Sequence, residues 1–165
     1  MVTLAPAAAH TLADVRRAVA AIPDPEIPVL TIADLGILRD VRMSATGHVD
    51  VDITPTYSGC PALDAIRDDV ERCVRAHGHS VSVHVVLSPA WTTDWLSADA
   101  RQRLREHGVA PPRTRDAGGL TELAIACPVC GSAHTSEVAH FAATPCQALR
   151  RCTACREPFQ HFKEH

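Results

Sequence analysis

The chain has 165 residues, of which 46% are hydrophobic and 4% aromatic, so it can form one aliphatic core of ordinary domain size and a small additional module. Its formal net charge of −3 disfavours a dedicated nucleic-acid-binding protein, which would present a basic surface. No apolar run is long enough to span a bilayer, and residues 1–10 lack the basic and apolar segments of a signal peptide. We therefore expect a cytoplasmic protein with no membrane partner, in which paired cysteines bind metal or are redox-active rather than forming disulfides.

The first half of the chain alternates between helical and strand patterns. Residues 1–10 are predicted to be a disordered tail, and Thr11 can cap the helix that follows, which ends before Pro23. A turn at residues 44–47 separates two strands that form a hairpin. The predicted elements are a helix at 11–22, strands at 37–43 and 49–54, a helix at about 61–77 and a strand at 81–87.

This order of elements predicts an α+β fold: a compact two-layer α/β domain (α-β-β-α-β, then a short helix) followed by a small C-terminal zinc-ribbon module. The short helix, at residues 97–107, follows a loop with both tryptophans, Trp91 and Trp95. We interpret that loop as a solvent-facing docking site, because aromatic residues are enriched in interaction hot spots; closure of the core is the alternative. The predicted units are the tail at 1–10, a domain at 11–110, a linker at 111–119 and the ribbon at 120–165.

Four of the seven cysteines form two Cys-x-x-Cys pairs near the C-terminus, Cys127 with Cys130 and Cys152 with Cys155. Two intervening residues let both sulfurs of a pair face one ion, and four thiolates suit tetrahedral Zn²⁺ with no open position for chemistry. A module this small also needs such a cross-link. We therefore predict a structural zinc site; iron in a rubredoxin-like site, a redox-active pair or disulfides are the alternatives.

The rest of the ribbon sequence narrows its role. Residues 120–165 contain four basic and four acidic residues, a balance that supplies no phosphate-binding stripe and favours a protein-contact or folding role. Cys146 is not needed by a four-cysteine site. We interpret it as a buried small hydrophobic residue, with an additional metal ligand as the alternative.

Cys60 stands far from the paired cysteines, directly before Pro61, where a helix is predicted to begin. If Pro61 is the first helical residue, Cys60 is the N-cap, and the helix dipole and free N–H groups favour its thiolate. Such a thiolate is a nucleophile or a ligand for a soft metal. An ordinary helix cap is the alternative. Cys73 lies on the apolar stripe of the same helix and is predicted to be part of the core.

Three motifs resemble, in order and spacing, those of the metal–sulfur cluster assembly domain family that includes the SufT proteins. They are Asp24-Pro25-Glu26-Ile27-Pro28, Ile32-Ala33-Asp34-Leu35-Gly36-Ile37 and Thr56-Tyr57-Ser58-Gly59-Cys60-Pro61. The resemblance covers about residues 10–90, although the approach Pro55-Thr56-Tyr57 departs from the family pattern. It implies that Cys60 is the functional residue and that Asp24 and Glu26 lie beside it, with Thr56 as a further candidate.

Nearly the whole chain is similar to the family of D subunits of bacterial phenylacetyl-CoA epoxidase, through residues 88–96, 104–112, 144–149 and 158–163. This resemblance implies an accessory subunit of a di-iron monooxygenase in aerobic phenylacetate degradation, not catalytic alone. Its implied task is to mature a metal centre through Cys60. That centre is either an iron–sulfur cluster in the ferredoxin-type reductase or iron in the oxygenase, and these components are its implied partners.

Three classes of function stay open. As an assembly factor, Cys60 would transiently hold iron or an iron–sulfur cluster, and a homodimer, Cys146 or a partner would supply further ligands. As a thiol-dependent enzyme, Cys60 would be a nucleophile and would need a histidine base, for which His48 and His84 are the candidates. As a structural interaction module, the chain would dock through the ribbon and the tryptophan loop.

Overall fold

The computed structural model describes residues 10–57, 59–113 and 124–164. Most of the predicted tail and residues 114–119 of the predicted linker therefore lie outside the described residues. The elements are α1 (Leu12–Ala20), β1 (Leu38–Met43), β2 (Val49–Ile53), α2 (Leu63–Ala76), β3 (Val81–Val85), η1 (Thr93–Trp95), α3 (Ala98–Glu106), β4 (Val109–Ala110), β5 (Thr135–Ala139), β6 (Gln147–Cys152) and β7 (Pro158–Phe162). The predicted order of the N-terminal domain, α-β-β-α-β followed by a short helix, is confirmed.

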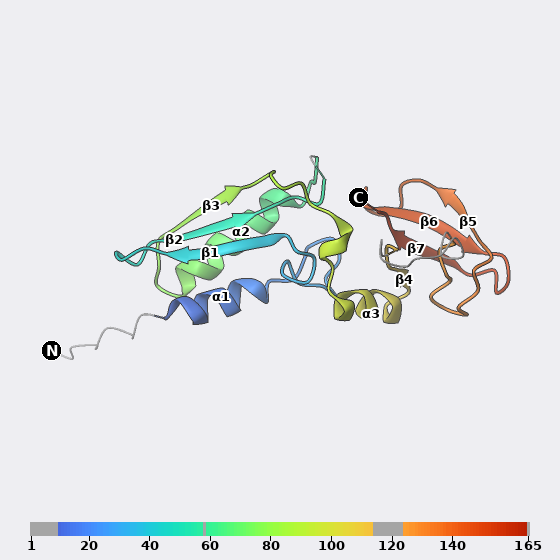
Figure 1. Ribbon diagram of the computed structural model, residues 1–165, viewed down its shortest axis with the longest axis horizontal. Coiled ribbons are helices and arrows are strands. Elements are labelled where there is room, and N and C mark those ends of the chain that lie inside the picture. The colour runs from blue at the N-terminus through green and yellow to red at the C-terminus, as the bar shows by residue number, and fades with distance from the viewer. Residues whose placement is uncertain (1–9, 58, 114–123, 165) are drawn as a thin grey trace.

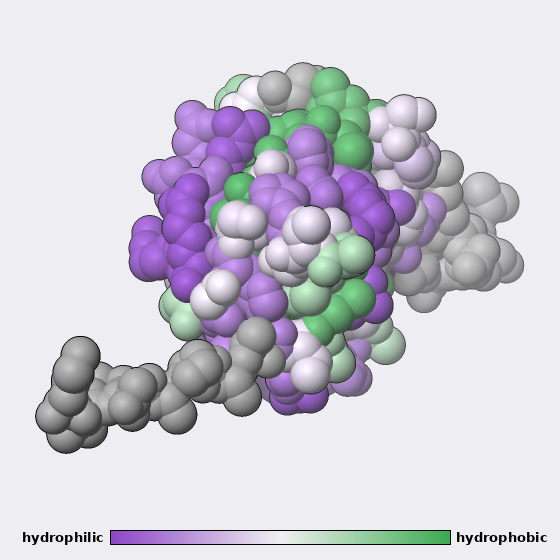
Figure 2. All heavy atoms as spheres, turned by 90° about the vertical axis from the view of Figure 1, so that its left-hand side faces the viewer, coloured by the Kyte–Doolittle hydropathy of each residue, from purple (hydrophilic) through white to green (hydrophobic). Residues whose placement is uncertain are grey.

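The N-terminal domain has two layers (Figure 1), with α1 and α2 packed against one face of a three-stranded sheet. β1 and β2 are antiparallel, and β3 runs parallel to β2 because α2 crosses between them. The alternation of β2 sets the layers: Val49, Val51 and Ile53 are fully buried beneath the helices, while Asp50 and Asp52 face outward. At the end of the molecule that carries the β1–β2 turn, the surface is mainly hydrophilic with small apolar patches (Figure 2).

The first helix begins at the predicted cap. The Asp14 N–H donates to Thr11 Oγ1 at 3.3 Å, and the Thr11 N–H donates to Asp14 Oδ2 at 3.1 Å, which completes a capping box. Val15 and Val19 then lie on the buried side of the helix. The local sequence is thus sufficient to place this helix and its apolar face.

Trp91 is part of the core, so the prediction of a solvent-facing docking loop is wrong for this residue. Its side chain is only 7% exposed, and its indole N–H donates to the Leu35 carbonyl at 2.8 Å. Its ring also lies 6.1 Å from that of Phe162, at the end of β7. Trp95 is half-buried beneath the guanidinium of Arg39, which sits 3.8 Å from the centre of its ring.

The C-terminal strands form a second sheet in the order β4-β7-β6-β5, which we call the ribbon module together with the loops of residues 124–164. β4 pairs in parallel with β7, so the end of the predicted N-terminal domain adds a strand to this sheet. The buried Arg101 side chain holds the connection by donating to the carbonyls of Thr93 and Pro112, both at 2.6 Å. The exact domain boundary stays a prediction.

The two sheets lie at opposite ends of the molecule with α3 near their junction (Figure 1), yet they share a core. Cys146 and Phe162 of the ribbon module belong to the main hydrophobic cluster of the N-terminal domain. A smaller cluster inside the module contains Ala110, Ile125, Cys127, Cys152 and Phe159. In the part of the chain that the structure describes, every helix is too short or too polar to cross a bilayer.

Candidate functional site

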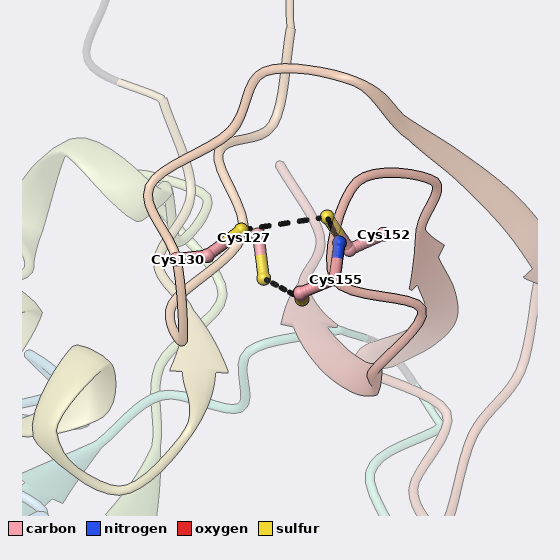
Figure 3. Close-up of side chains that lie close together, drawn as sticks. All are labelled: Cys127, Cys130, Cys152 and Cys155. Atoms are coloured by element: carbon pink, nitrogen blue, oxygen red, sulfur yellow. Dashed lines mark hydrogen bonds between the residues drawn. The ribbon is translucent and has the colours of Figure 1, made fainter.

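The four paired cysteines converge from two facing loops of the ribbon module (Figure 3). The first loop closes with a hydrogen bond from the Gly131 N–H to the Cys127 carbonyl at 2.9 Å, and Gly131 adopts a φ of 74° that favours glycine. The second loop follows β6 and turns back into β7. All four sulfurs lie within 4.8 Å of one another, the closest pairs being Cys127–Cys155 at 3.7 Å and Cys130–Cys152 at 3.6 Å.

These sulfur separations fit a single tetrahedral metal ion. A tetrahedron with metal–sulfur bonds of about 2.3 Å has edges of about 3.8 Å, whereas a disulfide would bring two sulfurs to about 2.0 Å. The Cys155 N–H donates to the sulfur of Cys152 at 3.5 Å, and this contact is the main cause that lowers the pKa of Cys152. Cys127 and Cys152 are buried while Cys130 and Cys155 face solvent, so the ion would join the small core to the surface loops.

Cys60 is not the N-cap of α2, and that prediction is wrong. The helix begins at Leu63 with Ala62 as its N-cap. Cys60 instead lies in a preceding turn, in which its N–H donates to the Tyr57 carbonyl at 3.2 Å and its carbonyl accepts from the Leu63 N–H at 3.3 Å. Burial raises the pKa of the Cys60 thiol, and hydrogen bonds to its sulfur from the Ala62 N–H and the Thr56 hydroxyl offset this only in part. The expected dipole-stabilised thiolate is therefore not present in this metal-free state.

The carboxyl groups of Asp24 and Glu26 lie near Cys60, as the family resemblance implied. Asp24 is 5% exposed, and its Oδ1 accepts from the N–H groups of Glu26 at 3.0 Å and Ile27 at 2.7 Å. Burial raises the pKa of Asp24, and it also raises that of Glu26, to which the charge of Asp24 adds. The negative charges of both carboxyls act on Cys60 and contribute to its raised pKa.

Cys146 reaches the same place from the ribbon module. It is 3% exposed, and its sulfur lies 3.8 Å from Glu26 Oε2, across 120 residues of sequence. The Thr144 hydroxyl is 3.1 Å from the same sulfur. Burial raises the pKa of Cys146 to about 11. Its position fits both interpretations of this residue, the buried hydrophobic side chain and the additional ligand.

The structure thus brings five predicted residues together at the junction of the two parts of the chain. We call Asp24, Glu26, Thr56, Cys60 and Cys146 the cross-domain cluster; their role as site residues stays a prediction. Sequence reasoning missed two neighbours. Tyr57 has its pKa raised by burial and by the nearby charges of Cys60, Glu26 and Cys146, and Thr144 contacts Cys146. Each could have been found from its place beside a candidate cysteine in the sequence.

His48 and His84, the proposed bases for a thiol enzyme, are engaged elsewhere. His84 Nε2 lies 2.9 Å from Asp50 Oδ1 on the outer face of the sheet. The ring nitrogens of His48 lie 2.8 Å from Ser80 Oγ and 3.0 Å from Ser82 Oγ. Both histidines therefore form hydrogen bonds along β2 and β3 rather than with Cys60, and the enzyme hypothesis finds no support in their positions.

Two known families match separate parts of the chain. Residues 12–85 match the family described as "Iron-sulfur cluster assembly protein", and residues 111–163 match the "PaaD zinc beta ribbon domain". The first region contains Cys60 and both carboxyls of the cross-domain cluster. The second contains Cys146 and the four paired cysteines, so the cluster joins the two matched regions.

Individual relatives cover either the whole chain or its first part. The chain is 44% identical to a protein of Escherichia coli K12 named as the putative D-type component of 1,2-phenylacetyl-CoA epoxidase, over 99% of this chain and 97% of that protein. It is 35% identical to an "Fe-S protein maturation auxiliary factor" of Porphyromonas gingivalis, over 58% of this chain and 91% of that protein. A solved domain of unknown function from Bacillus anthracis superposes with a TM-score of 0.53 at 26% identity, over 56% of this chain and 90% of that one.

Proposed function

The chain belongs to the family of 1,2-phenylacetyl-CoA epoxidase D subunits, and on that premise we propose that it is a non-catalytic accessory protein that assembles iron or iron–sulfur centres. The observation that carries this proposal is the position of Cys60. It lies in a region similar to iron–sulfur maturation factors and is surrounded by carboxyl and thiol groups that suit a metal better than a covalent substrate.

In this proposal Cys60 holds iron or an iron–sulfur cluster only transiently. A raised thiol pKa supports that role, because the proton competes with the metal and makes release to a partner easier. The recipients are the other components of a multicomponent epoxidase: either the oxygenase, which would receive iron, or the ferredoxin-type reductase, which would receive a cluster.

We further propose that the ribbon cysteines hold Zn²⁺ in a structural role. Four thiolates leave no open coordination position, and the sulfur spacing fits the bond length of zinc. Cys127, Cys130, Cys152 and Cys155 would be its ligands, and the ion would stabilise a module whose own hydrophobic cluster is small. The zinc site and the Cys60 site would then have separate tasks.

Replacing Cys60 with serine tests the main proposal. The epoxidase components are matured in cells that carry either wild type or Cys60→Ser, and their iron content and epoxidation rate are measured. We expect both to fall with Cys60→Ser and to be unchanged with Cys73→Ser, a matched control because Cys73 is also half-buried but lies outside the cluster. Full iron content and activity with Cys60→Ser would refute the proposal and leave the structural interaction role in its place.

A further inference from the structure

We propose that the ribbon module completes the Cys60 site, so that Cys60, Cys146 and Glu26 together bind one thiophilic divalent cation such as Fe²⁺ within a single chain. The inference rests on the proposed function, because it assigns the ligands of the ion that Cys60 is proposed to carry. Its new element is the contribution of the ribbon module, which supplies a ligand to the other domain besides holding its own metal.

The contact between Cys146 and Glu26 has the separation of two ligands of one ion. Their S–O distance is 3.8 Å, which is long for a strong hydrogen bond to a carboxylate. An ion bound to sulfur at about 2.3 Å and to oxygen at about 2.1 Å in tetrahedral geometry would place these two atoms about 3.6 Å apart. The pair therefore needs little movement to hold a metal, and the charge of Glu26 also acts on Cys60.

The charges of the cluster call for a cation. Its two thiols and two carboxyls gather at a largely buried junction. Among the described residues, no basic side chain forms an ion pair with Asp24 or Glu26, so a divalent ion would supply the missing positive charge. On binding, each thiol gives its proton to solvent as its sulfur takes up the ion, so two protons leave for one ion bound.

Other members of the cluster are arranged to support the ligands. Asp24 uses its carboxylate on the backbone N–H groups of residues 26 and 27, so it positions the turn that presents Glu26 rather than binding the ion itself. Each sulfur also has its own threonine, Thr56 at Cys60 and Thr144 at Cys146. Such hydrogen bonds orient ligands and stabilise thiolates, as second-layer contacts do in known metal sites.

Cys146 is held firmly enough to act as a ligand. The Lys163 N–H donates to its carbonyl at 3.0 Å, which ties it to the strand that ends with Phe162. Phe162 in turn is buried against Trp91 of the N-terminal domain. Cys60 and Glu26 are only half-buried, so an ion can enter and leave from their side while Cys146 stays enclosed.

The test uses the full-length protein with its ribbon site filled with zinc, titrated anaerobically with Co²⁺ as a probe for Fe²⁺. Zinc is spectroscopically silent, and cobalt does not displace it because cobalt binds the same ligands more weakly. We expect wild type to bind one further ion with sulfur-to-cobalt charge-transfer absorption. Cys146→Ala and Glu26→Gln should each weaken this binding by roughly a hundredfold, more than the loss of a supporting residue. Cys73→Ala should bind as wild type does.

The variants separate the two proposals. Wild-type affinity and absorption in both Cys146→Ala and Glu26→Gln, with binding lost in Cys60→Ser, would overturn the shared site and leave the proposed function standing. Undiminished binding in Cys60→Ser would overturn both, and the same holds if wild type binds no second ion. Zinc content and circular dichroism equal to wild type show that each variant is folded. Glu26→Gln lies outside the ribbon module, so it decides the matter even if Cys146→Ala does not fold.

Discussion

The two groups of cysteines differ in what brings their sulfurs together. In the ribbon module, each Cys-x-x-Cys loop places its own pair, and one antiparallel turn from β6 into β7 brings the pairs face to face. In the cross-domain cluster, Cys60 and Cys146 come from different domains and meet around Glu26 only because the ribbon module packs on the main core. The first group is therefore a property of a short sequence, and the second a property of the assembled fold.

The difference has a consequence for function. A site held by its own loops can keep its ion permanently, as the closed set of four thiolates does. A site divided between two domains can change with their relative position, which suits an ion that must be passed on. The following experiments test this contrast, from the largest expected effect to the smallest.

Loss of one buried ribbon ligand should have the largest effect. Cys152→Ser removes a fully buried sulfur, and structural zinc contributes apparent binding free energies of about 10–16 kcal/mol in small modules. We expect the zinc to be lost and β5, β6 and β7 to lose protection in amide hydrogen exchange, while α1 and α2 keep theirs. Zinc retained at one equivalent in Cys152→Ser would show that the four sulfurs do not share an ion.

Shortening Phe162 should separate the two parts of the chain without emptying the zinc site. This ring is 1% exposed in the main core, and its loss should lower the free energy of unfolding by about 3–5 kcal/mol. Urea denaturation measures that loss, and faster alkylation of Cys146 would report the opened junction. Phe141→Ala is the control, because this ring is exposed and its removal should cost about 0.5 kcal/mol or less. A loss as small in Phe162→Ala would argue against a shared core.

The ion pair between Asp34 and Arg103 should stabilise the N-terminal domain in a pH-dependent manner. Burial opposes ionisation of Asp34, but hydrogen bonds from Thr31, with the help of Arg103, outweigh it and lower the pKa of Asp34 below 3.8. The ionised carboxylate therefore stabilises the fold above that value, and the contribution is lost as pH falls through the lowered pKa.

Asp34→Asn should accordingly cost about 1–2 kcal/mol at neutral pH and progressively less in acid, as measured by urea unfolding across pH. Because Asp34 lies away from all the sulfurs, the zinc content should not change. A loss of stability that is equal at every pH would show that the charge of Asp34 is unimportant.

Cys73→Ala should have the smallest effect, because this thiol belongs to neither group. Burial alone raises the pKa of Cys73, so it has no polar partner to lose. We expect a change in unfolding free energy of about 1 kcal/mol or less and unaltered binding of both ions. A changed zinc or cobalt content in this variant would mean that the division into two groups is incomplete.

Several elements followed from local pattern alone. The capping pair Thr11 and Asp14 began α1, and alternation along β2 placed its valines inward. The start of α2 did not follow, because the turn at residues 57–60 uses the N–H of Cys60 and delays the helix until after Pro61. The fate of Trp91 was equally invisible, since the carbonyl that accepts its N–H lies 56 residues earlier.

The sequence by itself determined the ribbon metal site, because two Cys-x-x-Cys loops bring their sulfurs to ligand spacing through local geometry. It also marked Cys60, Asp24 and Glu26 as neighbours through the family resemblance. Only the tertiary structure decided that Cys146 joins them, because that contact spans 120 residues and depends on packing between two domains. Burial at the same junction also decided the protonation of Cys60, since it outweighs the local hydrogen bonds that the motif supplies.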